Sequence, residues 1–283
     1  MTQENTRIYL PEFTREEVRE IANRSVLLVP AGAIEQHGPH GPLQTDIDDS
    51  FSISMGAARA TNPNPRTVVG APVWFTPSAF DPAELPFGVR IREGVFKDAL
   101  NDILESYLRS GFKRIAIVNG HGGGTEWMIA DVVHRLIWSR ESKIWPDWKI
   151  PEDAKVVTFE YFAFLEVFAP DEMSEIRRTP PGSDWHGGDI ETALQLYLHP
   201  DLVHMDRAKR GSRLKPSQFA PHDLGRNWFW QYIIAGYYDG FEPGEVKGIT
   251  GDPTLATPRL GEDIYKLAVK KVAEFVREFA IST

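Results

Sequence analysis

The chain of 283 residues contains no cysteine. This excludes disulfide bonds, thiolate nucleophiles, iron–sulfur clusters and cysteine-based zinc sites, so any metal ion must be held by imidazole and carboxylate groups. Long apolar runs are also missing, since none reaches the roughly 18 residues of a membrane-spanning helix. The polar stretch from Met1 to Arg7 lacks the apolar segment of a secretory signal. We therefore expect a cytoplasmic protein that makes no membrane contact.

Basic residues are fewer than acidic residues in this chain. Lysine and arginine number 31 against 40 acidic residues, which gives a formal net charge of −9. A nucleic-acid partner is not expected, because a phosphate backbone attracts clustered Lys and Arg. Hydrophobic residues make up 42% of the chain, which is enough for a large core. Since we find no internal repeat and no low-complexity linker, we predict one domain over residues 1–283.

Short apolar runs alternate along the chain with segments of helical periodicity. The runs predict buried strands at 25–30, 67–75, 114–119 and 155–159. Helices are predicted at 48–60, 93–110, 125–139, 190–198 and 262–279, with Gly111 ending the second of them and Thr125 capping the third. This alternation favours an α/β fold, a three-layer domain with a mostly parallel central sheet. In such sheets ligands bind at the carboxyl ends of the strands.

The first candidate site follows the strand at 25–30. It reads E-Q-H-G-P-H over residues 35–40, and Asp46 follows in a loop rich in glycine and proline. Glu35 and His37 lie two apart, so in an extended segment both side chains project to one side, and the turn lets Asp46 return to the same point. Mixed carboxylate and imidazole ligation suits Zn²⁺, Mn²⁺ or Fe²⁺. The alternative is a polar loop whose Glu and His only satisfy backbone groups.

The second candidate site reads N-G-H-G-G-G over residues 119–124, between a predicted strand and a predicted helix. Glycines around His121 let the backbone approach a ligand closely and expose N–H groups near a helix N-terminus. A phosphate-binding loop is the competing interpretation, but the Lys-Ser/Thr of the Walker pattern is absent. A tight turn explains the glycines but not the histidine among them.

The third candidate site reads D-W-H-G-G-D-I-E-T over residues 184–192. Glu191 falls in the first turn of the predicted helix, where the helix dipole favours a carboxylate. Helix capping therefore competes with metal ligation as its role. His186 lies in the preceding loop, where it can act as an acid or a base.

Taken together and in this order, the three motifs resemble those of the creatininase (creatinine amidohydrolase) family. A fourth stretch, G-I-T-G-D-P-T-L-A-T over 248–257, is similar to a late segment of that family. The resemblance implies a homohexamer in which each chain holds two divalent metal ions (Zn, Mn or Fe) bridged by an aspartate. The family includes creatininase itself, deformylases of formamidopyrimidine intermediates and a peptidase of mycofactocin maturation.

The resemblance also implies roles for the residues that match the motifs. Asp46 would bridge the two metal ions, Glu35 and His121 would hold one of them, and His37 would hold the other. His186 matches a histidine that handles protons. Residues expected beside the substrate are Gly122, Asp184 and Trp185.

The motifs depart from creatininase itself at several positions. Gly123 stands where creatininase has a glutamate that ligates the second metal, and we expect Glu191 to replace it. Gly182-Ser183 stands in place of Trp-Asp, and E-L-P-F-G-V over 84–89 replaces the usual H-F-P-G-T run. Creatinine is therefore not the expected substrate.

We predict a metal-dependent amidohydrolase that cleaves a non-peptide C–N bond, in a cyclic amide or a formamide, of a small polar molecule by means of a metal-bridged hydroxide. The alternatives are a metal-dependent lyase or isomerase, a peptidase like the mycofactocin-maturation member, and a binding protein with a degenerate site. An aromatic-rich segment over 211–245 could shape a peptide pocket, although packing or an oligomer contact is the commoner role of such residues; its aromatics include Trp228, Phe229, Trp230, Tyr232, Tyr237 and Tyr238.

Overall fold

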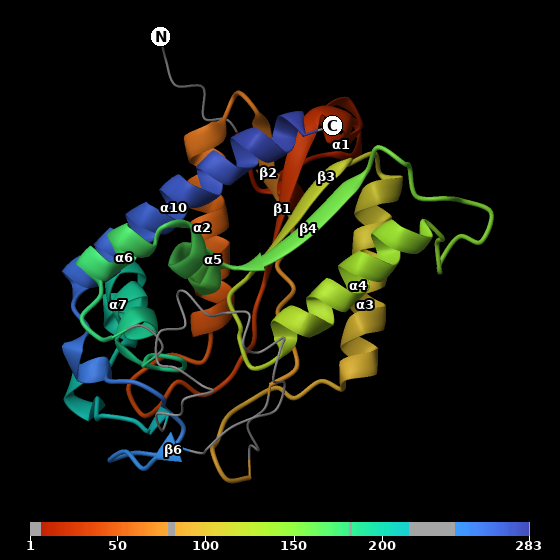
Figure 1. The fold of residues 1–283 in the computed structure, drawn as a ribbon. Helices are drawn as coiled ribbons and strands as arrows, with labels where there is room; N and C mark the ends of the chain where they lie inside the picture. Colours follow the sequence, from red (N-terminus) through yellow and green to blue (C-terminus); the bar gives the residue numbers. More distant parts are fainter. Residues whose placement is uncertain (1–6, 79–82, 181–182, 215–240, 283) are drawn as a thin grey trace.

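The computed structural model describes residues 7–78, 83–180, 183–214 and 241–282. Its centre is a four-stranded parallel sheet in the order β2-β1-β3-β4, with helices on both faces (Figure 1). The strands are β1 (Ser25–Ala31), β2 (Arg66–Val69), β3 (Arg114–Asn119) and β4 (Lys155–Glu160). The predicted α/β fold with a parallel central sheet between two helical layers is confirmed.

The described α-helices vary in length from 7 to 24 residues. They are α1 (Arg15–Ile21), α2 (Thr45–Thr61), α3 (Glu93–Arg109), α4 (Thr125–Ser139), α5 (Tyr161–Phe168), α6 (Pro170–Ile176), α7 (Asp189–Leu198) and α10 (Pro258–Ile281). Short 3₁₀ turns are η1 (Leu10–Glu12), η2 (Ala22–Arg24), η3 (Pro200–Leu202), η4 (Met205–Arg207) and η5 (Pro253–Leu255). Strands β5 (Arg213–Leu214) and β6 (Phe241–Glu242) form a separate antiparallel pair. No helix in the described part of the chain combines the length and the apolar character needed to cross a bilayer.

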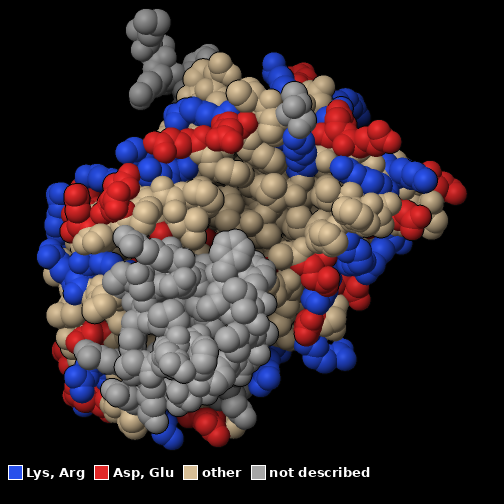
Figure 2. Space-filling model, in the orientation of Figure 1, with Lys and Arg blue, Asp and Glu red and all other residues tan. Residues whose placement is uncertain are grey.

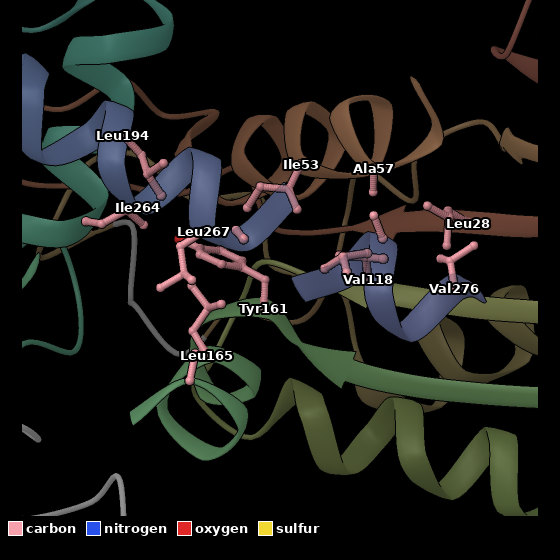
Figure 3. Packing of buried hydrophobic residues seen from close by; sticks show 14 of the residues in the cluster. Leu28, Ile53, Ala57, Val118, Tyr161, Leu165, Leu194, Ile264, Leu267 and Val276 are labelled. Atoms are coloured by element: carbon pink, nitrogen blue, oxygen red, sulfur yellow. The ribbon is translucent and has the colours of Figure 1, made fainter. Parts of the chain in front are cut away.

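The sheet separates two apolar clusters because successive side chains of a strand point to opposite faces. Val26 and Leu28 of β1 belong to the cluster beneath α2, α5, α7 and α10. Leu27 and Val29 belong to the opposite cluster, with residues of α3 and α4. Figure 3 shows the first cluster, in which Leu28 lies close to Val276 of α10. Both faces of the sheet are covered, so its carboxyl edge is where polar loops gather.

Charged side chains of both signs are intermingled on the face of the molecule seen in Figure 2. Acidic and basic groups alternate along α10 within a turn of each other, as in the Arg259 pairs with Glu262 and Asp263. These exposed pairs contribute little to stability. On this face the charge does not gather by sign.

Three predicted element boundaries differ from the observed ones by three residues or more. Helix α10 begins at Pro258 rather than at residue 262, with the Thr257 side chain as its cap. Helix α2 begins at Thr45 rather than at residue 48, which places Asp46 in its first turn. Strand β2 ends at Val69 rather than at residue 75, because Pro72 has no N–H for the ladder. Beyond it only a single bridge at Val73 continues the pairing with β1.

The glycine-rich loop before α4 also differs from the prediction. Gly124, with φ of +96°, is the N-cap of α4, and Thr125 is the first helical residue. The Thr125 hydroxyl donates instead to the carbonyl of Pro77, at 3.3 Å. Gly111 has φ of +104° directly after α3, as its predicted role at a helix end requires.

Glu105 of α3 is a fully buried carboxylate that anchors the segment after α4. It accepts hydrogen bonds from Asn101 Nδ2 (2.7 Å), Ser142 Oγ (2.5 Å), Lys143 N (2.9 Å) and Ile144 N (3.2 Å). Burial alone would raise the pKa of Glu105, but these hydrogen bonds outweigh it and hold the pKa below its ordinary value of 4.5.

Glu105→Ala is expected to lower the free energy of unfolding by about 3–5 kcal/mol, because several buried donors lose their acceptor. Since the pKa is lowered in the folded state, the carboxylate stabilises the fold above its ordinary pKa, and this contribution disappears as the pH falls through and below that value. The difference between the two proteins should therefore stay constant from pH 7 down to roughly pH 5.5 and shrink as the pH falls through 4.5 and below, as measured by urea denaturation. The control is Asp98→Ala, which breaks an exposed ion pair to Lys143 and should cost less than about 1 kcal/mol. An equal loss in both variants would show that the Glu105 hydrogen bonds do not anchor this segment.

Candidate metal centre

Parallel strands β1 and β3 bring the first two candidate sites together. They pair in register, with Ala31 opposite Asn119, so the loops that follow them leave the same edge of the sheet. Glu35 and His37 lie in the loop after β1, and His121 lies directly after β3. Gly120 permits this approach, because a Cβ there would lie 2.0 Å from the carbonyl oxygen of Asp46.

Asp46 lies at the centre of the group. Its Oδ1 is 2.9 Å from His37 Nε2, and its Oδ2 is 2.7 Å from His121 Nδ1. Glu35 Oε1 is 3.6 Å from His121 Nδ1, and Glu191 Oε2 is 3.6 Å from His37 Nε2. The four residues at positions 35, 37, 46 and 121 are each at most 4% exposed. The structure therefore brings together all five residues predicted to hold metal ions.

These side chains form two groups of three that share Asp46. The first is Glu35, Asp46 and His121, and the second is His37, Asp46 and Glu191, with the ligand atoms of each group within 4.8 Å of one another. Two cations on one bridging carboxylate would satisfy this arrangement. A third group joins Glu35 and His37 to His186, so His186 would lie beside both ions if they were bound.

The residues fit divalent cations in three further respects. Glu35 Oε2 is buried without a hydrogen-bond partner among the described residues, and His37 Nε2 is buried facing only carboxylates, with Asp46 Oδ1 at 2.9 Å and Glu191 Oε2 at 3.6 Å. Buried polar atoms of this kind are costly unless an ion or another group satisfies them. His37 Nδ1 lies 3.1 Å from the carbonyl of Glu35, which can only accept, so Nε2 is the nitrogen available as a ligand. Imidazole and carboxylate donors suit Zn²⁺, Mn²⁺ or Fe²⁺.

Protons compete with metal ions for this centre. Burial alone would lower the pKa of His37 and of His121, but the surrounding carboxylates raise the two values to about 10 and about 9. Burial by itself would raise the pKa of Asp46, yet the two imidazolium groups hold it below its usual range. Metal binding must therefore displace protons from both histidines, and metal affinity should rise with pH.

The sequence left two roles open for Glu191, helix capping and metal ligation, and its contacts in the structure are compatible with both. Its Oε2 accepts a hydrogen bond from Gly187 N at 2.5 Å, just before α7. The same oxygen faces His37 Nε2 in the second group of three. Burial raises the pKa of Glu191 to about 7. Gly123 has a left-handed backbone with φ of +68°.

His186 lies at the rim of the centre, with its side chain 15% exposed. Its Nδ1 is 3.6 Å from Glu35 Oε1, and its ring centroid is 4.4 Å from that of His37. Burial and the neighbouring His37 charge lower the pKa of His186 to about 3. The ring is therefore neutral at physiological pH.

The residues predicted to lie beside the substrate have different surroundings. Gly122 has open space where a side chain would be, with no atom within 4 Å of an added Cβ. Asp184 is buried, accepts a hydrogen bond from Ile190 N at 2.8 Å, and has a raised pKa because of burial and the nearby Asp189. Trp185 is partly exposed, and its backbone N–H donates to Thr250 O at 2.9 Å. The aromatic residues expected in the 228–238 stretch lie outside the described residues.

Two residues of the first motif have contacts that the sequence reading did not anticipate. Gln36 contacts both His186 and Gly248, and His40 Nε2 lies 2.9 Å from Thr192 Oγ1 of α7. In the sequence, the only indication that Gln36 or His40 has a role was its position inside E-Q-H-G-P-H. Both tie the first motif to the third.

An α/β sheet with buried imidazole and carboxylate groups gathered at its carboxyl edge defines an α/β protein with a candidate metal centre. The sequence model of the creatininase family, described as creatinine amidohydrolase, matches residues 11–276. This chain belongs to the creatininase family.

The chain is similar along most of its length to curated members of that family. It is 24% identical over 282 residues to a 3-dehydro-scyllo-inosose hydrolase of Thermotoga maritima, covering 96% of this chain and 84% of that protein. It is 27% identical over 258 residues to a mycofactocin precursor peptide peptidase of Mycolicibacterium smegmatis, covering 90% and 85%. A solved structure described as "Creatininase Mn" superposes with a TM-score of 0.74 at 21% identity, covering 98% of this chain and all of that one, which supports the fold.

Proposed function

We propose that this protein is an amidohydrolase that cleaves a non-peptide C–N bond, in a cyclic amide or a formamide, of a small polar molecule. The observation that carries the proposal is the convergence of two ligand groups on Asp46. Glu35, His121 and Asp46 would hold one divalent ion, and His37, Glu191 and Asp46 the other. We also propose that the chain is a single domain that works as a cytoplasmic homohexamer.

Two divalent ions bound there would lower the pKa of water and polarise a carbonyl group. The protein's own residues supply the rest of the chemistry. The carboxylates of Glu35 and Asp46 and their burial exclude bulk water from the centre and orient both imidazoles. The open space at Gly122 leaves its backbone accessible to a substrate beside His121. His186 would take a proton from the attacking water and return it to the leaving nitrogen.

The masses of the reaction products test this proposal. Protein loaded with zinc, manganese or iron is incubated with a panel of cyclic amides and N-formyl amines in ¹⁸O-labelled water and followed by mass spectrometry. Hydrolysis adds one water and places ¹⁸O in the new carboxylate. An unchanged mass would indicate an isomerase, and fragments without ¹⁸O a lyase. Protein that purifies free of metal and turns over no compound would indicate a degenerate binding site.

A peptidase is the second candidate, because a mycofactocin precursor peptide peptidase is among the relatives. The names of the relatives include an inosose hydrolase, a peptide peptidase and a creatinine amidohydrolase, so family membership alone does not decide the bond that is cleaved. Short peptides added to the same panel separate the two candidates. Cleavage of peptides alone would favour the second.

Glu191→Gln is expected to reduce the bound metal from two ions per chain to one. Glutamine preserves the acceptor for Gly187 N but removes a charged ligand from the second group only, so the Glu35 group keeps its ion. Metal content by mass spectrometry measures the change. The matched control is Glu126→Gln, which alters another first-turn glutamate that accepts from a loop N–H, Gly124 N, and should leave two ions. Two ions in both variants would mean that Glu191 only caps α7.

A further inference from the structure

Glu191 is the one proposed metal ligand that the central sheet does not position directly. The other proposed ligands follow β1 or β3 or lie in the first turn of α2, and the in-register pairing of β1 with β3 brings them to one edge of the sheet; they are Glu35, His37, Asp46 and His121. Glu191 lies in the first turn of α7, which packs against α10 and α2. Its distance from the other ligands therefore depends on contacts outside the sheet.

Two contacts hold the loop before α7 against the first motif. The Gln36 amide nitrogen lies 3.1 Å from His186 Nε2, and an added Cβ at Gly187 would lie 3.4 Å from the carbonyl carbon of His37. Gly187 N also donates to Glu191, but this hydrogen bond lies within the third motif and ties the carboxylate only to its own loop. These contacts place the loop and leave the rotation of α7 about its axis undetermined.

The contact that reaches α7 itself joins His40 to Thr192. His40 Nε2 lies 2.9 Å from Thr192 Oγ1, and the two residues are only 1% and 4% exposed. Either the ring or the hydroxyl can be the donor, and the hydrogen bond forms in both cases. The His40 carbonyl also accepts from His204 N at 2.9 Å, so the chain after α7 returns to this residue. Among the described residues, we find no other hydrogen bond between residues 35–40 and α7.

Thr192 directly follows Glu191, so the rotation that holds one side chain sets the direction of the other. Successive residues of an α-helix are roughly 100° apart around its axis. With Thr192 held at His40, Glu191 Oε2 is directed to His37 Nε2, at 3.6 Å. A rotation of α7 away from this position would leave the buried His40 nitrogen without its partner, which is costly.

We propose that His40 and Thr192 are positioning residues that fix the rotation of α7 on the first motif and thereby place Glu191 for the second metal ion. The metal-binding part of this statement rests on the proposed two-metal centre. His40 and Thr192 belong to none of the ligand groups, so they act on an ion only through Glu191. Groups that orient a metal ligand in this way contribute about 10- to 100-fold to metal affinity.

Thr192→Val tests the proposal because valine removes the hydroxyl and keeps the shape of the side chain. We expect the affinity for the second ion to fall about 10- to 100-fold, with the affinity for the first ion unchanged. Calorimetric titration of the metal-free protein with Zn²⁺, in competition with a chelator, resolves the two affinities. Thr192→Ser restores the hydroxyl and should recover most of the lost affinity. Equal weakening of both ions, or an unchanged second affinity, would overturn the proposal.

The matched control is Thr179→Val. Thr179 Oγ1 donates to Asp189 Oδ1 at 2.8 Å, so this substitution also removes a buried hydroxyl that is bonded to the first turn of α7. The lost hydrogen bond leads to the segment after α6 and not to the first motif, so both affinities should stay at their wild-type values. If both valine variants weakened the second ion equally, any loosening of α7 would displace Glu191, and His40 would have no specific role.

A double-mutant cycle tests whether the two residues act through their mutual contact. His40→Leu alone should weaken the second ion as Thr192→Val does. The double variant should bind the second ion no more weakly than the weaker single variant, because all three proteins lack the same hydrogen bond. Additive losses would mean that His40 and Thr192 act through separate contacts, which contradicts the proposal.

Crystal structures of the metal-free wild type and of metal-free Thr192→Val test the placement of Glu191 without any ion. We expect Glu191 Oε2 to move at least about 1 Å away from His37 Nε2 in the variant, and an unchanged distance would overturn the proposal. If the wild type binds only one ion while the carboxylate moves as expected, the proposed two-metal centre is wrong and the positioning role stands. If the wild type binds two ions and hydrolyses an amide, but Thr192→Val binds both ions equally well, the positioning role is wrong and the proposed function stands.

Discussion

Replacing Asp46 with alanine is expected to remove both metal ions and to abolish hydrolysis. Asp46 is the one residue shared by the two ligand groups, and its two oxygens approach His37 and His121 from the first turn of α2. Its loss leaves each ion with two protein ligands and leaves both imidazoles without their nearest negative charge. Because a divalent ion lowers the pKa of water by several units, activity should fall at least about 10⁴-fold.

Metal content and turnover of purified Asp46→Ala measure both consequences. The matched control is Asp49→Asn, one helical turn further along α2 and equally buried. Asp49 belongs to none of the ligand groups and accepts from Tyr161 OH at 3.1 Å and Gln195 Nε2 at 2.8 Å. Burial raises its pKa well above the ordinary value, so a neutral asparagine is a close substitute. The control should keep both ions, and an Asp46→Ala protein that also kept both would remove Asp46 from the bridging position.

His186→Ala is expected to keep both ions and to lose about 10²- to 10⁴-fold in kcat, the usual contribution of general acid–base catalysis. Nδ1 of His186 faces the centre at Glu35, whereas the two groups that share Asp46 are complete without it. KM should change much less than kcat, because the lost interaction belongs to the transition state.

The comparison variant for His186 is His134→Ala. His134 is exposed on α4 and stacks on Trp138, with ring centroids 5.7 Å apart, so its loss should leave both metal content and kcat unchanged. If His186→Ala turns over at the wild-type rate, protons reach the leaving nitrogen by another route. If it loses metal as well as activity, His186 belongs among the ligands.

Much of the fold follows from local pattern. The apolar runs that became β1 and β3 have both faces buried in a parallel sheet, and the glycine that ends α3 has the positive φ that such ends require. The predictions that failed depend on the hydrogen bonds of single residues at the ends of elements. Pro72 ends the regular pairing of β2 inside an apolar run, and Gly124, not the hydroxyl of Thr125, caps α4.

The sequence alone determined the chemistry that the site can offer. With no cysteine, only nitrogen and oxygen ligands remain, and the motifs after two predicted strands had to meet at one edge of the sheet. Tertiary structure alone decided which atoms meet there. It placed Glu191 both on Gly187 N and beside His37, and it directed His186 Nε2 to the carbonyl of Gln36. The reason is physical: periodicity reports which face of an element is buried, whereas a ligand set depends on distances between residues 75 to 150 positions apart, which only the packing of the whole sheet and its helices sets.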